Sequence, residues 1–117
     1  MFNFEGYQVY KTAQQICLVV DSKILKTPQV SRESKNQLHR AAMSILLNIA
    51  EGSGRQTNNE KRNFYTIARG SCYECVALIN LQILQGLIEP NIYEELHEHL
   101  TNVSKMLSGM IKTFKQN

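Results

Sequence analysis

The feature that most constrains this chain is the spacing of its apolar residues, which recur every three or four positions through most of its length. In residues 7–26 the apolar stripe consists of Val9, Ala13, Ile16, Cys17, Val20 and Ile24. In residues 31–50 it consists of Leu38, Ala42, Ile45 and Ile49. Near the C-terminus it consists of Ile92, Leu96, Val103, Leu107, Met110 and Phe114. This spacing is typical of amphipathic helices, and the period of two that marks a half-buried strand does not occur.

Helix-breaking and capping residues set the bounds of the first two predicted helices. The first helix, residues 7–26, ends at Thr27 because the residue before Pro28 avoids the helical region. Ser31 is placed to cap the second helix. Gly52 and Gly54 are expected to end that helix in left-handed conformations.

The third and fourth helices have similar signals. Thr57 and Glu60 match a capping box, and Gly86 ends the predicted third helix at residue 85. Gly70 lies inside this helix, where we expect a close approach of a neighbouring helix to offset its low helix propensity. Pro90 suits the first turn of the fourth helix. Because short connections make consecutive helices antiparallel neighbours, we predict an all-α, antiparallel up-down-up-down four-helix bundle that forms one domain over residues 1–117.

Composition agrees with a single globular domain. The chain has 117 residues, of which 43% are hydrophobic, and a net charge of +3. No stretch approaches the roughly 20 apolar residues of a membrane span, and the N-terminus lacks the pattern of a signal peptide. Three cysteines form no disulfide framework, so a reducing compartment fits. We therefore expect a cytoplasmic protein with no membrane association.

The segment MSILLNIAEGSGRQT, residues 43–57, ends in a glycine-rich turn that could suggest a phosphate-binding loop. That loop requires the pattern G-x-x-x-x-G-K-[ST] after a strand, whereas here the two glycines are two positions apart and no lysine follows them. We interpret the segment as a joint between two antiparallel helices.

The same segment carries a second apolar stripe beside the core stripe of the second helix. It consists of Met43, Leu46, Leu47 and Ala50. At 100° per residue the two stripes lie about 120° apart, so they cannot face the same core. Together with the apolar run VALINLQIL in residues 76–84, this pattern predicts a homo-oligomer interface on the two middle helices. The alternative is an irregular bundle that buries both stripes itself.

Two motifs that often carry chemistry have simpler explanations here. Cys72 and Cys75 form a C-x-x-C in the middle of a helix, away from the helix N-terminus that would lower a thiol pKa. His97 and His99 are two positions apart and point away from each other on a helix, so they do not complete a zinc site. We therefore expect small packing residues, and neither a metal nor a cofactor.

Asn48, Glu51 and Glu74 are polar residues for which we expect a structural role. Two carboxylates could form an acid–base pair, but no histidine, serine pair or metal ligand set accompanies them. We expect Asn48 or Glu74 to form hydrogen bonds near the turn or between helices. His39 is expected to be solvated or to lie in an interface.

Basic residues gather at one end of the predicted bundle, where the turn between the second and third helices meets both termini. They are Arg55, Lys61, Arg62, Lys11, Lys112 and Lys115. Gln56, Asn58 and Asn59 add hydrogen-bond donors, and Tyr65 could offer a stacking face. Phosphate contacts require such charge and donors, so we predict that this end binds RNA or DNA. The alternative is an ordinary solvated surface.

The stretch LHRAAMSILLNIAEGSGRQTNNEKRNFYTIARGSCYE, residues 38–74, resembles the four-helix-bundle family encoded in intervening sequences of bacterial 23S ribosomal RNA genes. Three pieces carry the resemblance: RAA-x-SI-x-x-NIAEG at 40–52, G-R at 54–55, and F-x-x-IA-x-GS-x-x-E at 64–74. L-SGMIK at 107–112 and Y-x-VY at 7–10 also fit, so it covers nearly the whole chain. One departure is Leu46-Leu47, where the family commonly has Pro-Ser.

The resemblance implies an antiparallel bundle that assembles as a homo-pentamer and has no established enzymatic activity. It also implies kinship with the accessory protein of diversity-generating retroelements, a basic pentameric barrel that binds nucleic acid and reverse transcriptase. We therefore predict a non-catalytic oligomeric protein that binds nucleic acid as a scaffold or accessory factor. The alternative is a structural protein–protein adaptor that uses the apolar middle helices. An enzyme is the least favoured interpretation.

Overall fold

The structure is a computed structural model that describes residues 1–115, and within them it contains four α-helices and no strand. The helices are α1 (Gln8–Val19), α2 (Arg32–Ser53), α3 (Asn58–Leu84) and α4 (Pro90–Thr113). A short 3-10 helix, η1 (Asn3–Gly6), precedes α1, and one turn of π-helix, η2 (Val20–Ile24), follows it. The predicted all-α fold is confirmed. Among the described helices, none has the length and apolar character needed to span a bilayer.

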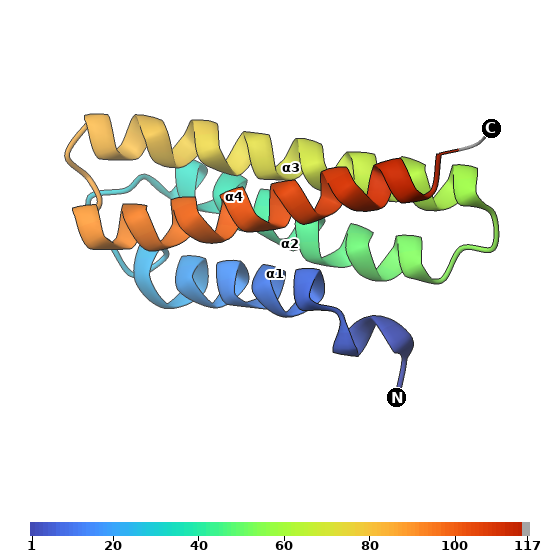
Figure 1. The fold of residues 1–117 in the computed structure, drawn as a ribbon. Helices are drawn as coiled ribbons and strands as arrows, with labels where there is room; N and C mark the ends of the chain where they lie inside the picture. The colour runs from blue at the N-terminus through green and yellow to red at the C-terminus, as the bar shows by residue number, and fades with distance from the viewer. Residues whose placement is uncertain (116–117) are drawn as a thin grey trace.

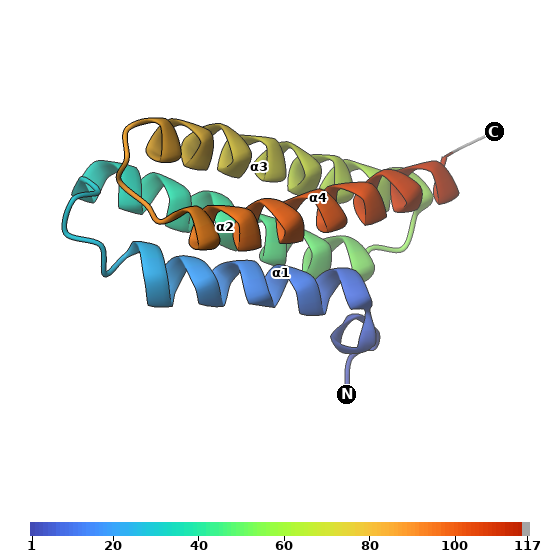
Figure 2. The same ribbon diagram turned by 60° about the vertical axis from the view of Figure 1, so that its left-hand side comes forward.

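The four helices lie side by side, and the chain reverses direction between each helix and the next (Figures 1 and 2). Residues of α1 contact α2, α2 contacts α3, α3 contacts α4, and α4 contacts α1. This arrangement is consistent with the predicted up-down-up-down order. The start of α1, the connection between α2 and α3, and the end of α4 share one end of the molecule (Figure 1), which we call the turn end.

The predicted first helix is divided into α1 and the π-helical turn η2. The amide of Leu25 donates to the carbonyl of Val20 at 3.0 Å, a bond across five residues that widens the last turn. Val19 and Val20, at the junction of α1 and η2, are both buried. The apolar stripe predicted for residues 7–26 still faces the core, with Cys17 only partly buried.

Side-chain caps form where the sequence predicts them. The Ser31 hydroxyl accepts a hydrogen bond from the amide of Ser34 at 3.1 Å, and the Thr57 hydroxyl accepts one from the amide of Glu60 at 3.2 Å. Each cap satisfies an amide that would otherwise lack a partner in the first helical turn. Pro90 opens α4, as expected.

Two predictions about glycines are wrong. The only positive φ in residues 1–115 belongs to Gly86 (φ 70), which follows α3, whereas Gly54 has a φ of −87 and Gly52 is helical. Gly70 is exposed, and a Cβ there would have no heavy atom within 4 Å, so no helix approaches it closely. The close approach occurs at Gly52, where a Cβ would lie 2.7 Å from Cε1 of Tyr65.

The core lies along the axis between the four helices. Its largest fully buried side chains include Tyr65, Ile16, Leu38, Ile49, Leu100 and Leu107. Cys72 and Cys75 are also buried, and the burial raises the pKa of Cys72 to about 12 and raises that of Cys75 as well. Both thiols therefore stay protonated at neutral pH and act as small packing groups, as expected.

Candidate nucleic-acid interface at the turn end

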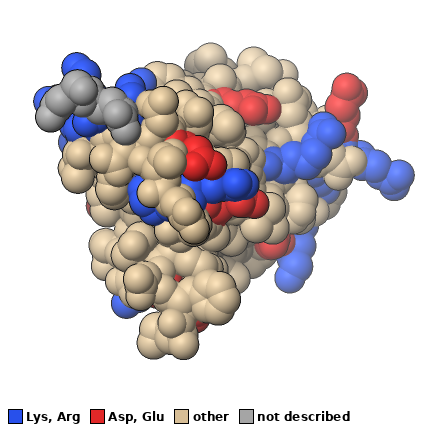
Figure 3. Space-filling view, turned by 90° about the vertical axis from the view of Figure 1, so that its right-hand side faces the viewer, with Lys and Arg blue, Asp and Glu red and all other residues tan. Residues whose placement is uncertain are grey.

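The six predicted basic residues come from elements that meet at the turn end. Lys11 lies in the first turns of α1, Arg55 in the connection after α2, and Lys61 and Arg62 at the start of α3. Lys112 lies in the last turn of α4, and Lys115 follows it. Figure 3 shows this end: basic side chains are dispersed over a mostly uncharged surface, and acidic side chains lie beside some of them. The structure thus brings the six to one end without forming a continuous basic patch.

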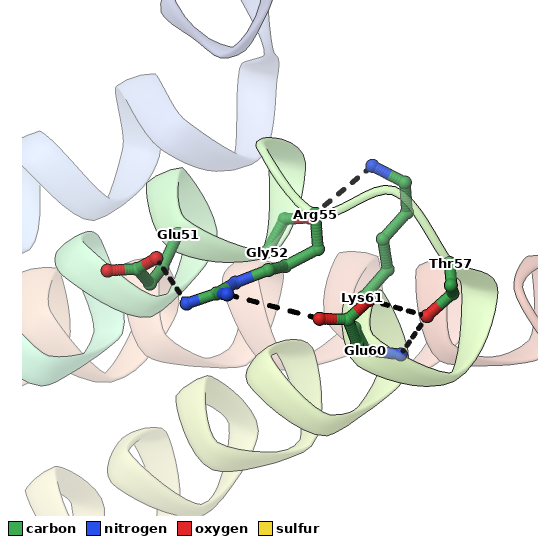
Figure 4. A network of polar contacts seen from close by, with 6 residues as sticks. All are labelled: Glu51, Gly52, Arg55, Thr57, Glu60 and Lys61. Carbon is green, nitrogen blue, oxygen red and sulfur yellow. Dashed lines mark hydrogen bonds and ion pairs between the residues drawn. The ribbon is translucent and has the colours of Figure 1, made fainter.

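Arg55 is held by partners within the chain (Figure 4). Its guanidinium donates to the Glu51 carboxylate at 2.9 Å and lies 3.9 Å from the Glu60 carboxylate. It also lies 4.6 Å from the centre of the Phe64 ring, within range of a cation–π interaction. Arg55 therefore joins the end of α2 to the start of α3, and much of its charge is compensated locally.

Lys61 also has partners within the chain. Its Nζ donates to the carbonyl of Ser53 at 3.0 Å. It also donates to the carbonyl of Gly52 at 3.4 Å (Figure 4). These carbonyls end α2, where the negative end of the helix dipole favours a cation. The same Nζ lies 5.8 Å from the centre of the Phe114 ring. Lys61 thus ties together α2, α3 and the end of α4.

The other four basic side chains are freer. In the part of the chain that the structure describes, Lys11, Arg62, Lys112 and Lys115 form no ion pair. The three lysines are exposed, and Arg62 is partly exposed with its Nε buried. The candidate interface therefore centres on these four residues. Arg55 and two of the three N–H groups of Lys61 hold the turn behind it.

Tyr65 does not offer the stacking face that the sequence suggests. Its side chain is 1% exposed and packs against Phe114, with the two ring centres 5.9 Å apart. Burial, with a smaller contribution from nearby Tyr7, raises the pKa of Tyr65 to about 12. The ring is a core element beneath Gly52.

The three polar residues predicted to be structural have different surroundings. The Asn48 amide donates to the carbonyl of Ser44 at 2.8 Å and to its hydroxyl at 3.1 Å. The Ser71 hydroxyl donates to the Ser44 hydroxyl at 2.7 Å, which connects α3 to α2. Glu51 pairs with Arg55, whereas Glu74 is exposed and has no hydrogen bond to a described side chain. Glu51 thus acts near the turn, Asn48 bonds within its own helix α2, and Glu74 lies on the outer surface.

The predicted interface stripe of α2 is divided between two environments. Leu46 packs against the core and lines a groove with Cys17 and Leu18 of α1. Leu47 is 56% exposed, and Met43 and Ala50 are partly exposed. The monomer therefore covers part of this stripe itself and leaves Leu47 outward.

Sequence reasoning missed most of a longer exposed stripe on α3, which we call the α3 outer face. It comprises Ile67, Gly70, Glu74, Ala77, Leu81 and Leu84, spaced three and four residues apart and all exposed. Ile67 is 51% exposed and Leu84 84% exposed. The helical spacing of these residues was the available signal, but the apolar run in residues 76–84 obscured which of its side chains face the core.

No group of three or more His, Cys, Asp or Glu residues in positions 1–115 could hold a metal ion. His39 lies 3.1 Å from the carboxylate of Asp21, and both side chains are well exposed. His99 lies 4.0 Å from the carboxylate of Glu95, one helical turn away. Each of these two contacts joins neighbouring surface groups.

Comparison with known proteins places this architecture among its relatives. The family model described as 23S rRNA-intervening sequence protein matches residues 5–109. Among solved structures, the chain resembles a protein with unknown function from the S23 ribosomal protein family of Bacteroides thetaiotaomicron. The two are 24% identical, with a TM-score of 0.83 over 89% of this chain and 98% of the other. At this identity, the likeness shows the fold alone. No curated protein matches the chain.

Proposed function

Because the chain belongs to the 23S rRNA-intervening sequence protein family, we propose that it is a non-catalytic, homo-oligomeric scaffold that binds RNA or DNA at its turn end. The observation that carries the proposal is the set of four basic side chains there without ion-pair partners among the described residues: Lys11, Arg62, Lys112 and Lys115. The thiols of its C-x-x-C motif suit the reducing cytoplasm.

The chemistry of these side chains suits a phosphate backbone. Ammonium and guanidinium groups contact phosphates regardless of sequence, and their binding releases counterions from the nucleic acid. Among residues 1–115, the acidic side chains at the turn end are Glu5, Glu51 and Glu60, and the last two already face Arg55. The four cations, which form no ion pair with a described residue, therefore keep a local positive charge that a polyanion can neutralise.

The test compares the two ends of the bundle. The variant in which Lys11, Lys112 and Lys115 are all changed to alanine removes three exposed charges from the turn end. The control, with Lys23, Lys26 and Arg32 changed to alanine, removes three exposed charges from elsewhere. We expect the first variant to lose affinity for a labelled RNA or DNA strand in fluorescence anisotropy, and the control to retain it. Equal effects of both variants would refute a site at the turn end.

Assembly through α2 and α3 is the second part of the proposal. Leu47, Ile67, Leu81 and Leu84 expose apolar surface, and fully burying one such side chain contributes about 1.5–3 kcal/mol. A second copy of the chain covers this surface, and a closed ring leaves no unpaired patch. Five copies is the number that the family resemblance implies. Leu46 is a weaker candidate because the monomer already covers much of it.

A matched pair of variants tests the assembly. Leu47→Glu combined with Ile67→Glu places carboxylates in the proposed interface, where burial without partners is unfavourable. Leu18→Glu is the control, since Leu18 is 58% exposed but lies on α1. Light scattering after size exclusion should show that the double variant dissociates and that the control remains oligomeric. A monomeric wild-type protein would refute this part, and would leave the adaptor alternative, in which another protein covers the α3 outer face.

A further inference from the structure

A cavity of about 570 Å³ lies at the turn end, between the start of α1, the start of α3 and the end of α4. Its volume is within the range of small-molecule sites. Accessible aromatic and thioether side chains form much of its lining: Tyr7, Met106, Met110 and Phe114, while Tyr65 borders it but is 1% exposed. Flat rings and polarisable sulfur atoms make favourable contacts with a planar aromatic group. The cavity therefore suits a ligand with a flat, largely apolar body.

One cation belongs to the lining. The ammonium of Lys61 has three N–H donors, and two of them are directed at the carbonyls of Gly52 and Ser53. The third is available to an anionic group on the ligand. The lining also includes Tyr7 and Thr113, whose hydroxyls can bond to polar edges of a ring.

The cavity lies among the cations of the candidate interface. Lys112 immediately precedes Thr113 of the lining, and Lys115 immediately follows Phe114. Lys11 lies one helical turn after Tyr7 and Gln8. A ligand with its flat group in the cavity would therefore extend its charged part toward several ammonium groups, as a polyanion requires.

We infer that this cavity receives an unpaired nucleobase of a single-stranded nucleic acid, with an adjoining phosphate at Lys61. The inference rests on the proposed function and specifies which form of nucleic acid the turn end binds. Base–aromatic stacking is available only to bases outside a duplex, so the turn end prefers single strands. It also tolerates many sequences, because every base has a flat face.

Gly109 provides the test, because it lines the cavity and a Cβ there would have no heavy atom within 4 Å. Gly109→Leu therefore adds a side chain whose Cβ has room at the cavity and whose outer atoms compete with the base for its space. Asn102→Leu is the control, since Asn102 is exposed on α4 and does not line the cavity. Phe114→Ala is a second test variant, which removes a stacking surface and leaves the space open. Far-UV circular dichroism checks that all three variants fold.

The affinity of each protein is measured by anisotropy for a labelled mixed-sequence RNA strand, alone and as a duplex with its complement. We expect the wild-type protein and Asn102→Leu to prefer the single strand, and Gly109→Leu and Phe114→Ala to bind it on the order of tenfold or more weakly. Duplex binding should change little. If Gly109→Leu binds the single strand as the wild type does, the inference is wrong, although binding at the turn end stands.

Two further outcomes distinguish the inference from the proposed function. If the wild-type protein binds neither strand nor duplex, both are wrong. Titration with AMP, followed by NMR, identifies the source of the base. AMP that binds in a Gly109-dependent manner, while RNA strands do not bind, would make the ligand a free nucleotide and overturn the single-strand inference.

Discussion

Replacing Gly52 by alanine should destabilise the protein, whereas the same change at Gly70 should stabilise it. Both glycines are helical, so each variant gains helix propensity: roughly 1 kcal/mol at Gly70 inside α3, and less at Gly52, the second-last residue of α2. At Gly52 the new methyl group would lie 2.7 Å from Cε1 of Tyr65 and 3.1 Å from Cβ of Phe64. Tyr65 is 1% exposed, so its ring cannot move into solvent. Overpacking of this kind costs about 1–3 kcal/mol.

The difference between the two variants reports mainly the steric effect, because both gain helix propensity but only Gly52→Ala meets Tyr65. We expect Gly52→Ala to be about 1–3 kcal/mol less stable than Gly70→Ala. Urea unfolding followed by far-UV circular dichroism measures this difference. All samples need the same protomer concentration, because oligomerisation changes apparent stability. Since Gly70 lies on the α3 outer face, light scattering must also show that Gly70→Ala keeps the oligomeric state of the wild type. If Gly52→Ala is as stable as Gly70→Ala, the close contact between α2 and Tyr65 is wrong.

Three further predictions concern the cap, the bond between α2 and α3, and the buried ionisable groups. Thr57→Ala should lower the free energy of unfolding by about 1 kcal/mol through loss of the α3 cap, while Thr66→Ala, exposed within the same helix, should change it little; equal effects would contradict the capping role. A double-mutant cycle of Ser44→Ala and Ser71→Ala should give a coupling of about 0.5–1.5 kcal/mol from their 2.7 Å hydrogen bond, and strict additivity would count against it. Burial raises the pKa of Cys72 from 9.0 to about 12 and that of Tyr65 from 10.0 to about 12, so the unfolded chain loses these protons first. These groups should therefore leave the free energy of unfolding unchanged below pH 9.0 and lower it as the pH rises from 9.0 toward about 12, as measured by urea titrations. A constant free energy of unfolding over that pH interval would contradict their burial.

The sequence predicted helix bounds well because local chemistry determines them. Ser31, Thr57 and Pro90 act through the backbone of their own helical turn, so their roles can be recognised without knowing the tertiary structure. The turn of π-helix after α1 was not predicted, because Val19 and Val20 follow no spacing that distinguishes a widened turn from an α-helix.

The roles of individual glycines depended on tertiary packing and were assigned incorrectly. A helical glycine has the same local signal whether another helix touches it or not. Only the position of Tyr65 on α3 shows that Gly52 lies at the close contact and that Gly70 lies on an open surface.

The sequence predicted that the six basic residues gather at one end, but it did not predict which of them have partners inside the chain. The sequence places six basic residues near one another, while the structure shows that Arg55 and Lys61 have partners inside the chain. Similarly, the second stripe of α2 was recognised, but helical spacing could not show that α1 covers Leu46 and leaves Leu47 exposed. These distinctions depend on which side chains neighbouring helices present, which one helix does not encode.

The salt dependence of nucleic-acid binding tests the central claim most directly. If Lys11, Arg62, Lys112 and Lys115 each contact one phosphate, a single strand short enough to bind one turn end should give a slope of log K against log salt of about −3. Changing Lys11, Lys112 and Lys115 to alanine should reduce the magnitude of this slope by about 2, since each lost contact removes about 0.7. A slope near zero for the wild-type protein, or an unchanged slope in the variant, would contradict binding of nucleic acid at the turn end.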